Sequence, residues 1–170
     1  MTKEVLFVVA PSNYRDEEYT YPKEILEKAG YTIVTASLVT GEIKGVMGTK
    51  AVSDITVDNA DGGRYAAVVF VGGPGTQVLF NNPGAQRIAR DASAKGKVIG
   101  AICMGPGTVA NAGVLKGRKA TSFESVVDML TAGGALYTGS NVETDGNIIT
   151  ASGPKYAKEF GQAVLAALTK

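Results

Sequence analysis

Three short apolar runs set the strongest limit on how this chain can fold. They occupy residues 5–10 (VLFVVA), 66–71 (AAVVFV) and 98–102 (VIGAI), and each has the length of a buried strand. Strands that are apolar on both faces are typical of parallel sheets covered by helices on both sides. Between the runs, residues 16–29 and 83–95 carry apolar side chains at helical spacing.

The rest of the chain continues this alternation. Residues 31–37 form a β-branched stretch that predicts a strand. Residues 142–150 predict a hairpin, because the Asp-Gly pair within them suits a type I′ turn. Residues 38–64 are rich in glycine and are expected to be irregular, apart from a short strand near 55–57. The remaining helices are predicted at 105–112, 124–132 and 154–168.

Together these elements predict one domain over residues 1–170, without a linker, a repeat or a low-complexity segment. Strand–helix–strand units favour an α/β fold with a doubly wound, mainly parallel sheet and helices on both faces. The hairpin adds one antiparallel strand. Pro22 lies inside the first predicted helix, where it must kink the helix or begin its regular part.

Composition removes several classes of function. The chain has no histidine, so it supplies no imidazole for a Ser-His-Asp or Cys-His pair or for a zinc site. Its one cysteine, Cys103, excludes an intrachain disulfide and a multi-cysteine metal site. With 17 Lys+Arg against 16 Asp+Glu, the chain lacks the positive charge that nucleic acids and anionic membranes attract.

We therefore expect no metal, no cofactor, no nucleic-acid partner and no membrane partner, since no cofactor-binding motif is present either. The first apolar run has six residues, fewer than a signal peptide or a membrane helix needs. This favours a cytoplasmic protein, in which a lone thiol stays reduced.

Cys103 is the leading candidate for a functional residue, because ligands in such folds bind beyond the carboxyl ends of the strands. It follows the run 98–102 directly and precedes Met104-Gly105-Pro106-Gly107, the layout of a nucleophile elbow. The dipole of the following helix is expected to lower the pKa of the thiol. The alternative is a buried structural cysteine, which is common.

A glycine cluster follows the run 66–71 at the same predicted edge. Gly72, Gly73 and Pro74 form a turn whose backbone N–H groups suit an oxyanion hole or an anion nest. The alternative is a plain connection between a strand and a helix.

Three carboxylates, Asp16, Glu17 and Glu18, open the first predicted helix. Acidic residues at this position commonly compensate the helix dipole, and Asp16 is expected to be a surface or capping residue of this kind. A second interpretation is that one of the three lies beside Cys103, where it would be kept protonated and act as an acid or a base.

In combination these residues resemble the ThiJ/PfpI superfamily, small flavodoxin-like proteins that include intracellular proteases, protein deglycases and cofactor-independent glyoxalases. The resemblance spans nearly the whole chain. It rests on Glu18 four residues before Pro22 and on the elbow at Cys103. It also rests on VGGPG at 71–75, AGVLKGRKAT at 112–121 and DGNIIT at 145–150.

The resemblance implies a role for each matching residue. Cys103 matches the nucleophile, and Glu18 matches the carboxylic acid that contacts its thiol. The amides implied to face the thiol and to form the oxyanion site are those of Gly72, Gly73 and Met104. The resemblance further implies a homodimer, which in protease-like members assembles into a hexamer.

The chain departs from the family pattern around the same cleft. Met104 stands where protease-like members have a histidine, Gln77 where they have a glutamate, and Phe123 lies in the loop where deglycases have a histidine. A thiol–imidazole mechanism is therefore absent and proteolysis is not expected. The apolar replacements suit a small, weakly polar substrate. Pro74 and Glu17 are expected to line the cleft, Glu17 also being the fallback acid.

Three functions remain open. The first is a cysteine-dependent, cofactor-independent enzyme of the glyoxalase or deglycase type, in which Cys103 attacks a small reactive carbonyl and Glu18 moves the proton. The second is a non-enzymatic stress-response protein, either a redox sensor through Cys103 or a chaperone. The third is an isocyanide-hydratase-like or residual peptidase-like hydrolase, which Glu18 disfavours, because hydrating relatives usually have aspartate there.

Overall fold

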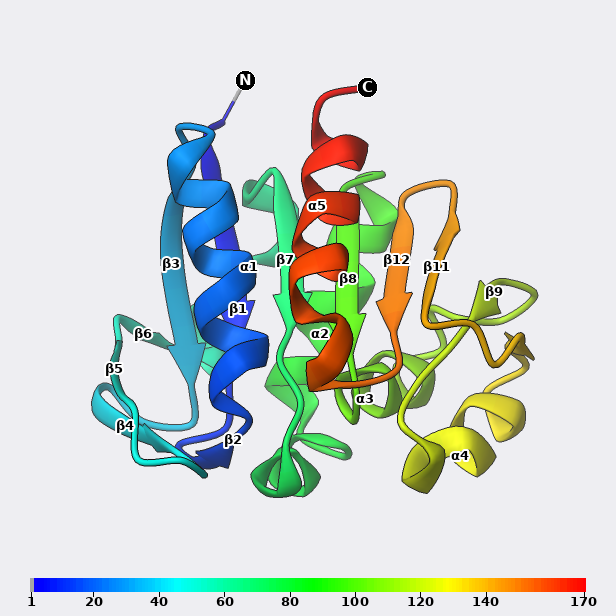
Figure 1. Cartoon of the computed structure of the whole chain (residues 1–170), viewed down its shortest axis with the longest axis horizontal. Helices are drawn as coiled ribbons and strands as arrows, with labels where there is room; N and C mark the ends of the chain where they lie inside the picture. Colours follow the sequence, from blue (N-terminus) through cyan, green and yellow to red (C-terminus); the bar gives the residue numbers. More distant parts are fainter. Residues whose placement is uncertain (1) are drawn as a thin grey trace.

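The computed structural model describes residues 2–170 and contains a seven-stranded sheet with helices on both faces (Figure 1). Its strand order is β11-β12-β8-β7-β1-β3-β6, and every neighbouring pair is parallel except β11 and β12. The strands are β1 (Glu4–Val8), β3 (Thr32–Ser37), β6 (Ile55–Thr56), β7 (Ala67–Phe70), β8 (Val98–Ile102), β11 (Val142–Asp145) and β12 (Ile148–Ala151). The predicted mainly parallel α/β fold and its hairpin are confirmed.

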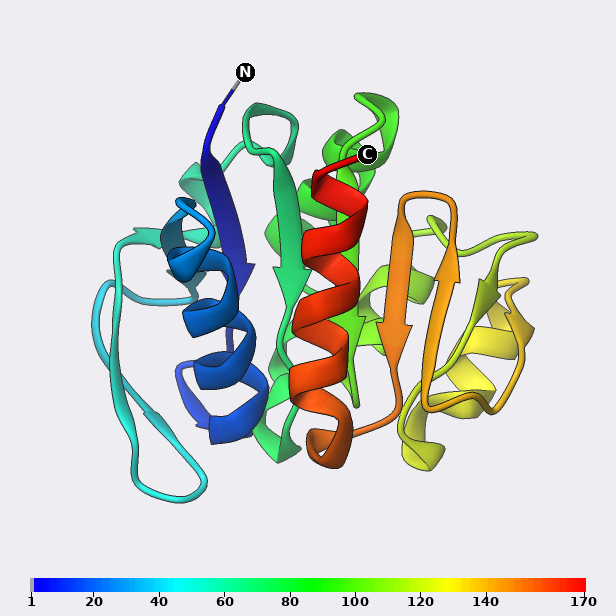
Figure 2. The same ribbon diagram turned by 45° about the horizontal axis from the view of Figure 1, so that its top comes forward.

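Two layers of helices enclose two separate apolar cores. Helices α1 (Asp16–Lys28) and α5 (Ala157–Leu168) cover one face, and α2 (Pro83–Ala94) and α3 (Gly105–Asn111) cover the other (Figures 1 and 2). Leu26 and Phe160 lie in the core under the first pair, and Ile88 and Val109 lie in the core under the second. The sheet is therefore apolar on both sides, as the sequence predicts.

Helix α1 continues through Pro22 rather than beginning there. It packs closely against α5, because Gly161 presents no side chain at the crossing. A Cβ at Gly161 would lie 3.0 Å from the Cα of Pro22 and 2.8 Å from Cδ1 of Ile25. Helix α4 (Val127–Ala132) lies at the far end of the sheet, beyond β11.

Two small sheets flank the main one and were not predicted. The first has the order β2 (Ser12–Tyr14), β4 (Gly41–Gly45), β5 (Lys50–Ser53), so the prediction of an irregular segment over 38–64 is wrong for these residues. The second joins β9 (Lys119–Ala120) to β10 (Leu136–Tyr137). The short 3-10 helices are η1 (Val57–Asn59), η2 (Gly62–Arg64), η3 (Pro74–Leu79), η4 (Glu124–Val126) and η5 (Pro154–Tyr156).

A buried carboxylate at the start of α1 holds the turn between β4 and β5. Asp16 accepts hydrogen bonds from the N–H groups of Met47 at 2.8 Å and Thr49 at 2.9 Å. These partners are more than 30 residues away in the sequence. A local sequence pattern therefore does not reveal the small sheet.

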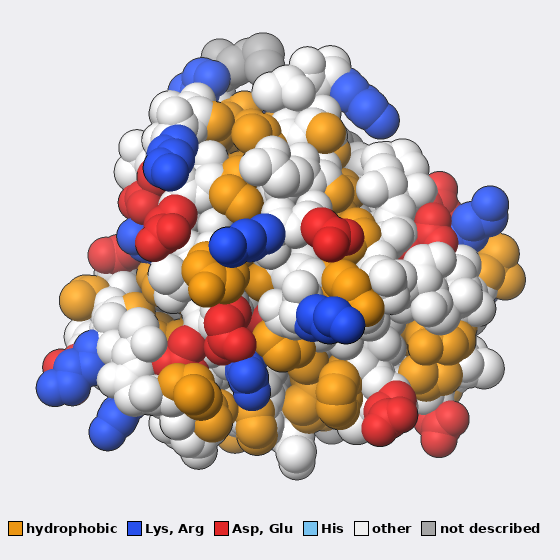
Figure 3. Space-filling view, in the orientation of Figure 1, with side chains coloured by type: hydrophobic (Ala, Val, Ile, Leu, Met, Phe, Trp, Pro, Cys, Tyr) orange, Lys and Arg blue, Asp and Glu red, His pale blue; other side chains and the backbone are white. Residues whose placement is uncertain are grey.

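The surface over α1 and α5 carries charges of both signs. Figure 3 shows Lys and Arg side chains interspersed there with Asp and Glu and with apolar atoms. No helix within residues 2–170 combines the length and the apolar character that crossing a membrane requires.

Candidate active site

Cys103 occupies a sharp bend between β8 and α3. Its φ is +62°, in the left-handed region that residues other than glycine rarely adopt. Two backbone hydrogen bonds hold it there: its N–H donates to the carbonyl of Ala151 at 2.8 Å, and its carbonyl accepts from the N–H of Phe123 at 2.8 Å. The predicted strand–cysteine–helix elbow is confirmed, and this backbone costs about 1–2 kcal/mol.

Small residues after Cys103 allow the bend to sit against the neighbouring strand. A Cβ on Gly105 would run into the carbonyl group of Phe70 at the end of β7. Glycine at position 105 therefore has a steric cause, since a larger residue there would push α3 away from the sheet.

Glu18 lies in the first turn of α1 and is completely buried. Its Oε1 accepts a hydrogen bond from the N–H of Gly72 at 3.0 Å. Its Oε2 is buried and has no hydrogen-bond partner within residues 2–170. Burial raises the pKa of Glu18 to about 8, against a smaller lowering by the thiol of Cys103 and by the Gly72 N–H.

Gly72 lies beside both the acid and the nucleophile. A Cβ on Gly72 would lie 2.6 Å from Oε1 of Glu18, 2.6 Å from the carbonyl oxygen of Ile102 and 2.8 Å from Cβ of Cys103. Only glycine leaves room at this position for the carboxyl and the thiol to interact.

The thiol of Cys103 is 6% exposed, and burial is the main cause that raises its pKa. The adjacent Glu18 raises the pKa further, whereas the backbone N–H groups of Met104 and Gly73 lower it. The expectation of a lowered thiol pKa is therefore wrong for this structure, because burial outweighs the two amides. Burial therefore favours the protonated form of both the thiol and the carboxyl.

The three predicted oxyanion amides have two different roles. Those of Gly73 and Met104 interact with the sulfur. The amide of Gly72 instead holds the carboxyl of Glu18. Gly73 has a φ of +120°, and a Cβ there would lie 2.8 Å from the carbonyl oxygen of Asn13, so the turn is pressed against β2.

The remaining predicted residues lie nearer the surface. Glu17 is bound by Arg15, with Nε to Oε1 at 3.0 Å and Nη2 to Oε2 at 2.9 Å, so its carboxylate is already engaged. Met104 is half-buried and packs against both cores. The exposed members of the set are Pro74, Gln77 and Phe123, the last 40% exposed.

Asp16 is neither the surface residue nor the capping residue that the sequence predicts, because it is 5% exposed and its carboxylate ties the 46–49 turn to the first turn of α1. No local signal marks this role. Across the part of the chain that the structure describes, no three His, Cys, Asp or Glu side chains gather as a set of metal ligands.

Comparisons with known proteins show the family to which this fold and sequence belong. The chain is 33% identical to the deglycase PfpI of Pyrococcus furiosus, over 88% of this chain and 90% of that protein. It is 28% identical to the glutathione-independent glyoxalase DJR-1.2 of Caenorhabditis elegans, over 98% of this chain and 89% of that protein. The crystal structure of a ThiJ/PfpI domain protein from Brachyspira murdochii superposes with a TM-score of 0.96 at 33% identity, covering 99% of this chain and 97% of that one. The DJ-1/PfpI family model matches residues 3–167, and the chain belongs to that family.

Proposed function

We propose that this protein is a cysteine-dependent enzyme that needs no cofactor and converts small reactive carbonyls, in the manner of a glyoxalase or deglycase. The observation that carries the proposal is the buried Oε2 of Glu18, which has no hydrogen-bond partner among the described residues and belongs to a carboxyl coupled to the thiol of Cys103. An acid in such a place can exchange a proton with the thiol or with a substrate while its Oε1 stays bonded to the N–H of Gly72.

The reactive form is the pair that has lost one of its two protons. The proton that remains is shared between Glu18 and Cys103, so the macroscopic pKa belongs to the pair. When the sulfur is the deprotonated partner, the thiolate attacks the aldehyde carbon of a dicarbonyl such as methylglyoxal. The C–S bond forms and the carbonyl oxygen becomes an alkoxide, to which the N–H groups of Gly73 and Met104 offer hydrogen bonds.

Glu18 then completes the proton transfers. Its carboxylic acid protonates the alkoxide to give a hemithioacetal, and the resulting carboxylate removes the hydrogen from the same carbon. The resulting enediolate takes this proton at the neighbouring carbon, and the hydroxyl proton on the first carbon moves to the second oxygen, which produces a thioester of a 2-hydroxy acid. Water hydrolyses the thioester, which releases the hydroxy acid and restores the thiol of Cys103. No oxidant or reductant is consumed.

The names of the relatives support this chemistry, since they include deglycases and a glutathione-independent glyoxalase. The redox-sensor alternative uses the same Cys103 thiolate, and it differs in its outcome: the thiol would be oxidised readily without turnover of an aldehyde. Peptidase chemistry of the thiol–imidazole type is absent, because the chain has no histidine.

The experiment is to follow lactate formation from methylglyoxal with the wild type, Cys103→Ser, Glu18→Gln and the matched control Glu17→Gln, in the presence of a chelator. We expect turnover by the wild type and by Glu17→Gln. We expect a loss of at least about 100-fold in the other two variants. Full activity of Cys103→Ser or of Glu18→Gln would exclude the mechanism, and no turnover by the wild type would exclude this substrate.

We also propose that the chain forms a homodimer, as the family resemblance implies. Apolar side chains on the lobe formed by β4 and β5 support this, because Met47 is 69% and Val52 is 64% exposed. Light scattering after size exclusion tests it, with Met47→Lys expected to shift the species toward the monomer. A wild type that stays monomeric at high concentration would contradict it.

A further inference from the structure

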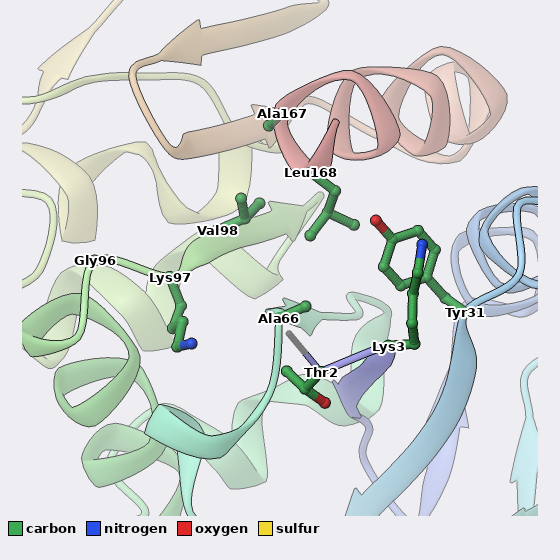
Figure 4. Close-up of a pocket in the computed structure, with 9 residues that line it drawn as sticks. All are labelled: Thr2, Lys3, Tyr31, Ala66, Gly96, Lys97, Val98, Ala167 and Leu168. Carbon is green, nitrogen blue, oxygen red and sulfur yellow. The ribbon is translucent and has the colours of Figure 1, made fainter. Parts of the chain in front are cut away.

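A cavity lies at the opposite end of the sheet from Cys103. It has a volume of about 200 Å³ and opens beside the first residues of β1, β7 and β8 (Figure 4). Val98 lines it and begins β8, whereas Cys103 follows the last residue of the same strand. At about 3.3 Å per residue the two places are roughly 16 Å apart, so this cavity does not belong to the thiol site.

The lining of the cavity is more apolar than polar. Ala66, Val98, Ala167 and Leu168 contribute to it, from the approach to β7, from β8 and from the end of α5. The ring of Tyr31 forms a further wall, and Figure 4 shows its hydroxyl directed toward Leu168. Such a lining favours a ligand with a hydrocarbon body.

The rim of the cavity is positively charged. Lys3 and Lys97 are the charged residues that line it, and no carboxylate of the described residues does so. The ammonium of Lys3 lies 4.6 Å from the centroid of the Tyr31 ring. Within residues 2–170 neither lysine takes part in an ion pair. The cavity therefore presents two positive charges without a counter-charge beside an apolar floor.

We propose that this cavity binds a small monocarboxylate with an apolar body, such as an aromatic or short branched carboxylic acid. The ammonium groups of Lys3 and Lys97 at the rim attract the carboxylate, and the hydrocarbon part fills the space above Ala66 and Leu168. The size agrees, since a protein cavity of about 150 Å³ is known to hold benzene. An inorganic anion would leave the apolar floor in contact with water, and a neutral hydrocarbon would leave both lysines without an anion.

The test is a titration of ¹⁵N-labelled protein with benzoate, and in parallel with benzyl alcohol, which has a similar shape and no charge. We expect saturable shifts at the amides of Gly96, Lys97 and Ala66, and none at Met104. Benzoate is expected to bind at least about tenfold more tightly than benzyl alcohol. This binding does not depend on the chemistry proposed for Cys103.

Three lysine variants make the test specific. Lys97→Met and Lys3→Met are each expected to weaken benzoate binding by about tenfold. Lys95→Met removes an exposed lysine two residues before Lys97 that does not line the cavity, and it is expected to bind benzoate like the wild type. Equal binding of benzyl alcohol, equal losses in all three variants, or shifts centred on Met104 would each overturn the proposal.

Discussion

The protonation of Glu18 makes the stability of the protein depend on pH in a way that one substitution removes. In the folded chain burial raises the pKa of Glu18 from 4.5 to about 8. Between these values the folded state binds one more proton than the unfolded state. The free energy of unfolding therefore falls as the pH rises, and the loss is complete once the pH exceeds the folded-state pKa.

The size of the effect follows from the same two pKa values. Each pH unit inside this interval removes about 1.4 kcal/mol, so the whole interval corresponds to a loss on the order of 5 kcal/mol. From pH 5.5 to 7.5 we expect the wild type to lose about 2.5 kcal/mol. The carboxyls of Asp16 and Asp145, whose pKa values are lowered, act only at more acidic pH.

The assay is urea unfolding of the wild type, Glu18→Gln and Glu17→Gln at pH 5.5, 6.5 and 7.5, at one protein concentration. A glutamine at position 18 is neutral at every pH and keeps an oxygen for the N–H of Gly72. Its unfolding free energy should stay flat over this range. Glu17→Gln removes only a carboxylate near the surface and should keep the wild-type slope.

If the unfolding free energy of the wild type does not fall as the pH rises, the Cys103→Ser variant identifies the cause. A flat wild type beside a sloping Cys103→Ser variant would mean that the thiol is already ionised at neutral pH, which would refute a site in which both groups are protonated. Parallel curves for the wild type and Glu18→Gln would show that Glu18 is not a buried neutral acid.

Three further outcomes are expected. The value of kcat/KM for methylglyoxal should rise about tenfold per pH unit below pH 8 and level off above it, as read from initial rates, because the singly protonated pair is the reactive form; a profile flat from pH 6 to 9 would contradict this. Gly72→Ala should lower the melting temperature and abolish turnover, whereas Gly153→Ala, whose Cβ meets no described atom within 4 Å, should change neither; equal behaviour of the two would contradict the steric argument. Asp16→Asn should speed proteolytic cleavage at the 46–49 turn and cost about 1–3 kcal/mol in urea unfolding, since two N–H groups lose a charged acceptor; unchanged cleavage would refute the anchoring role.

The sequence predicts those parts of the fold that local patterns determine. The strands β1, β7 and β8 are mostly or entirely apolar, and the elbow at Cys103 follows from a strand that ends in a cysteine and small residues. The sheet of β2, β4 and β5 was missed because its strands are short and its anchor, Asp16, is distant in the sequence.

In the candidate site, too, the sequence predicts some features and misses others. The sequence predicts that Glu18 lies beside Cys103 only through the family resemblance, which rests on residue types and their spacing. The direction of the thiol pKa depends on how deeply the sulfur is buried, which the sequence does not report. The sequence also does not report which group the N–H of Gly72 binds. In the structure this N–H points to the carboxyl of Glu18 rather than to the sulfur.

The residues that hold the elbow at Cys103 come later in the sequence and are therefore synthesised after it. The N–H of Cys103 bonds to Ala151 and its carbonyl bonds to Phe123, both far downstream in the sequence. During synthesis the cysteine is therefore complete as a residue long before β12 exists to fix its backbone. A nascent chain, or one cut before residue 151, carries the thiol without the Ala151 carbonyl that holds its N–H, so the complete site requires the C-terminal part of the domain.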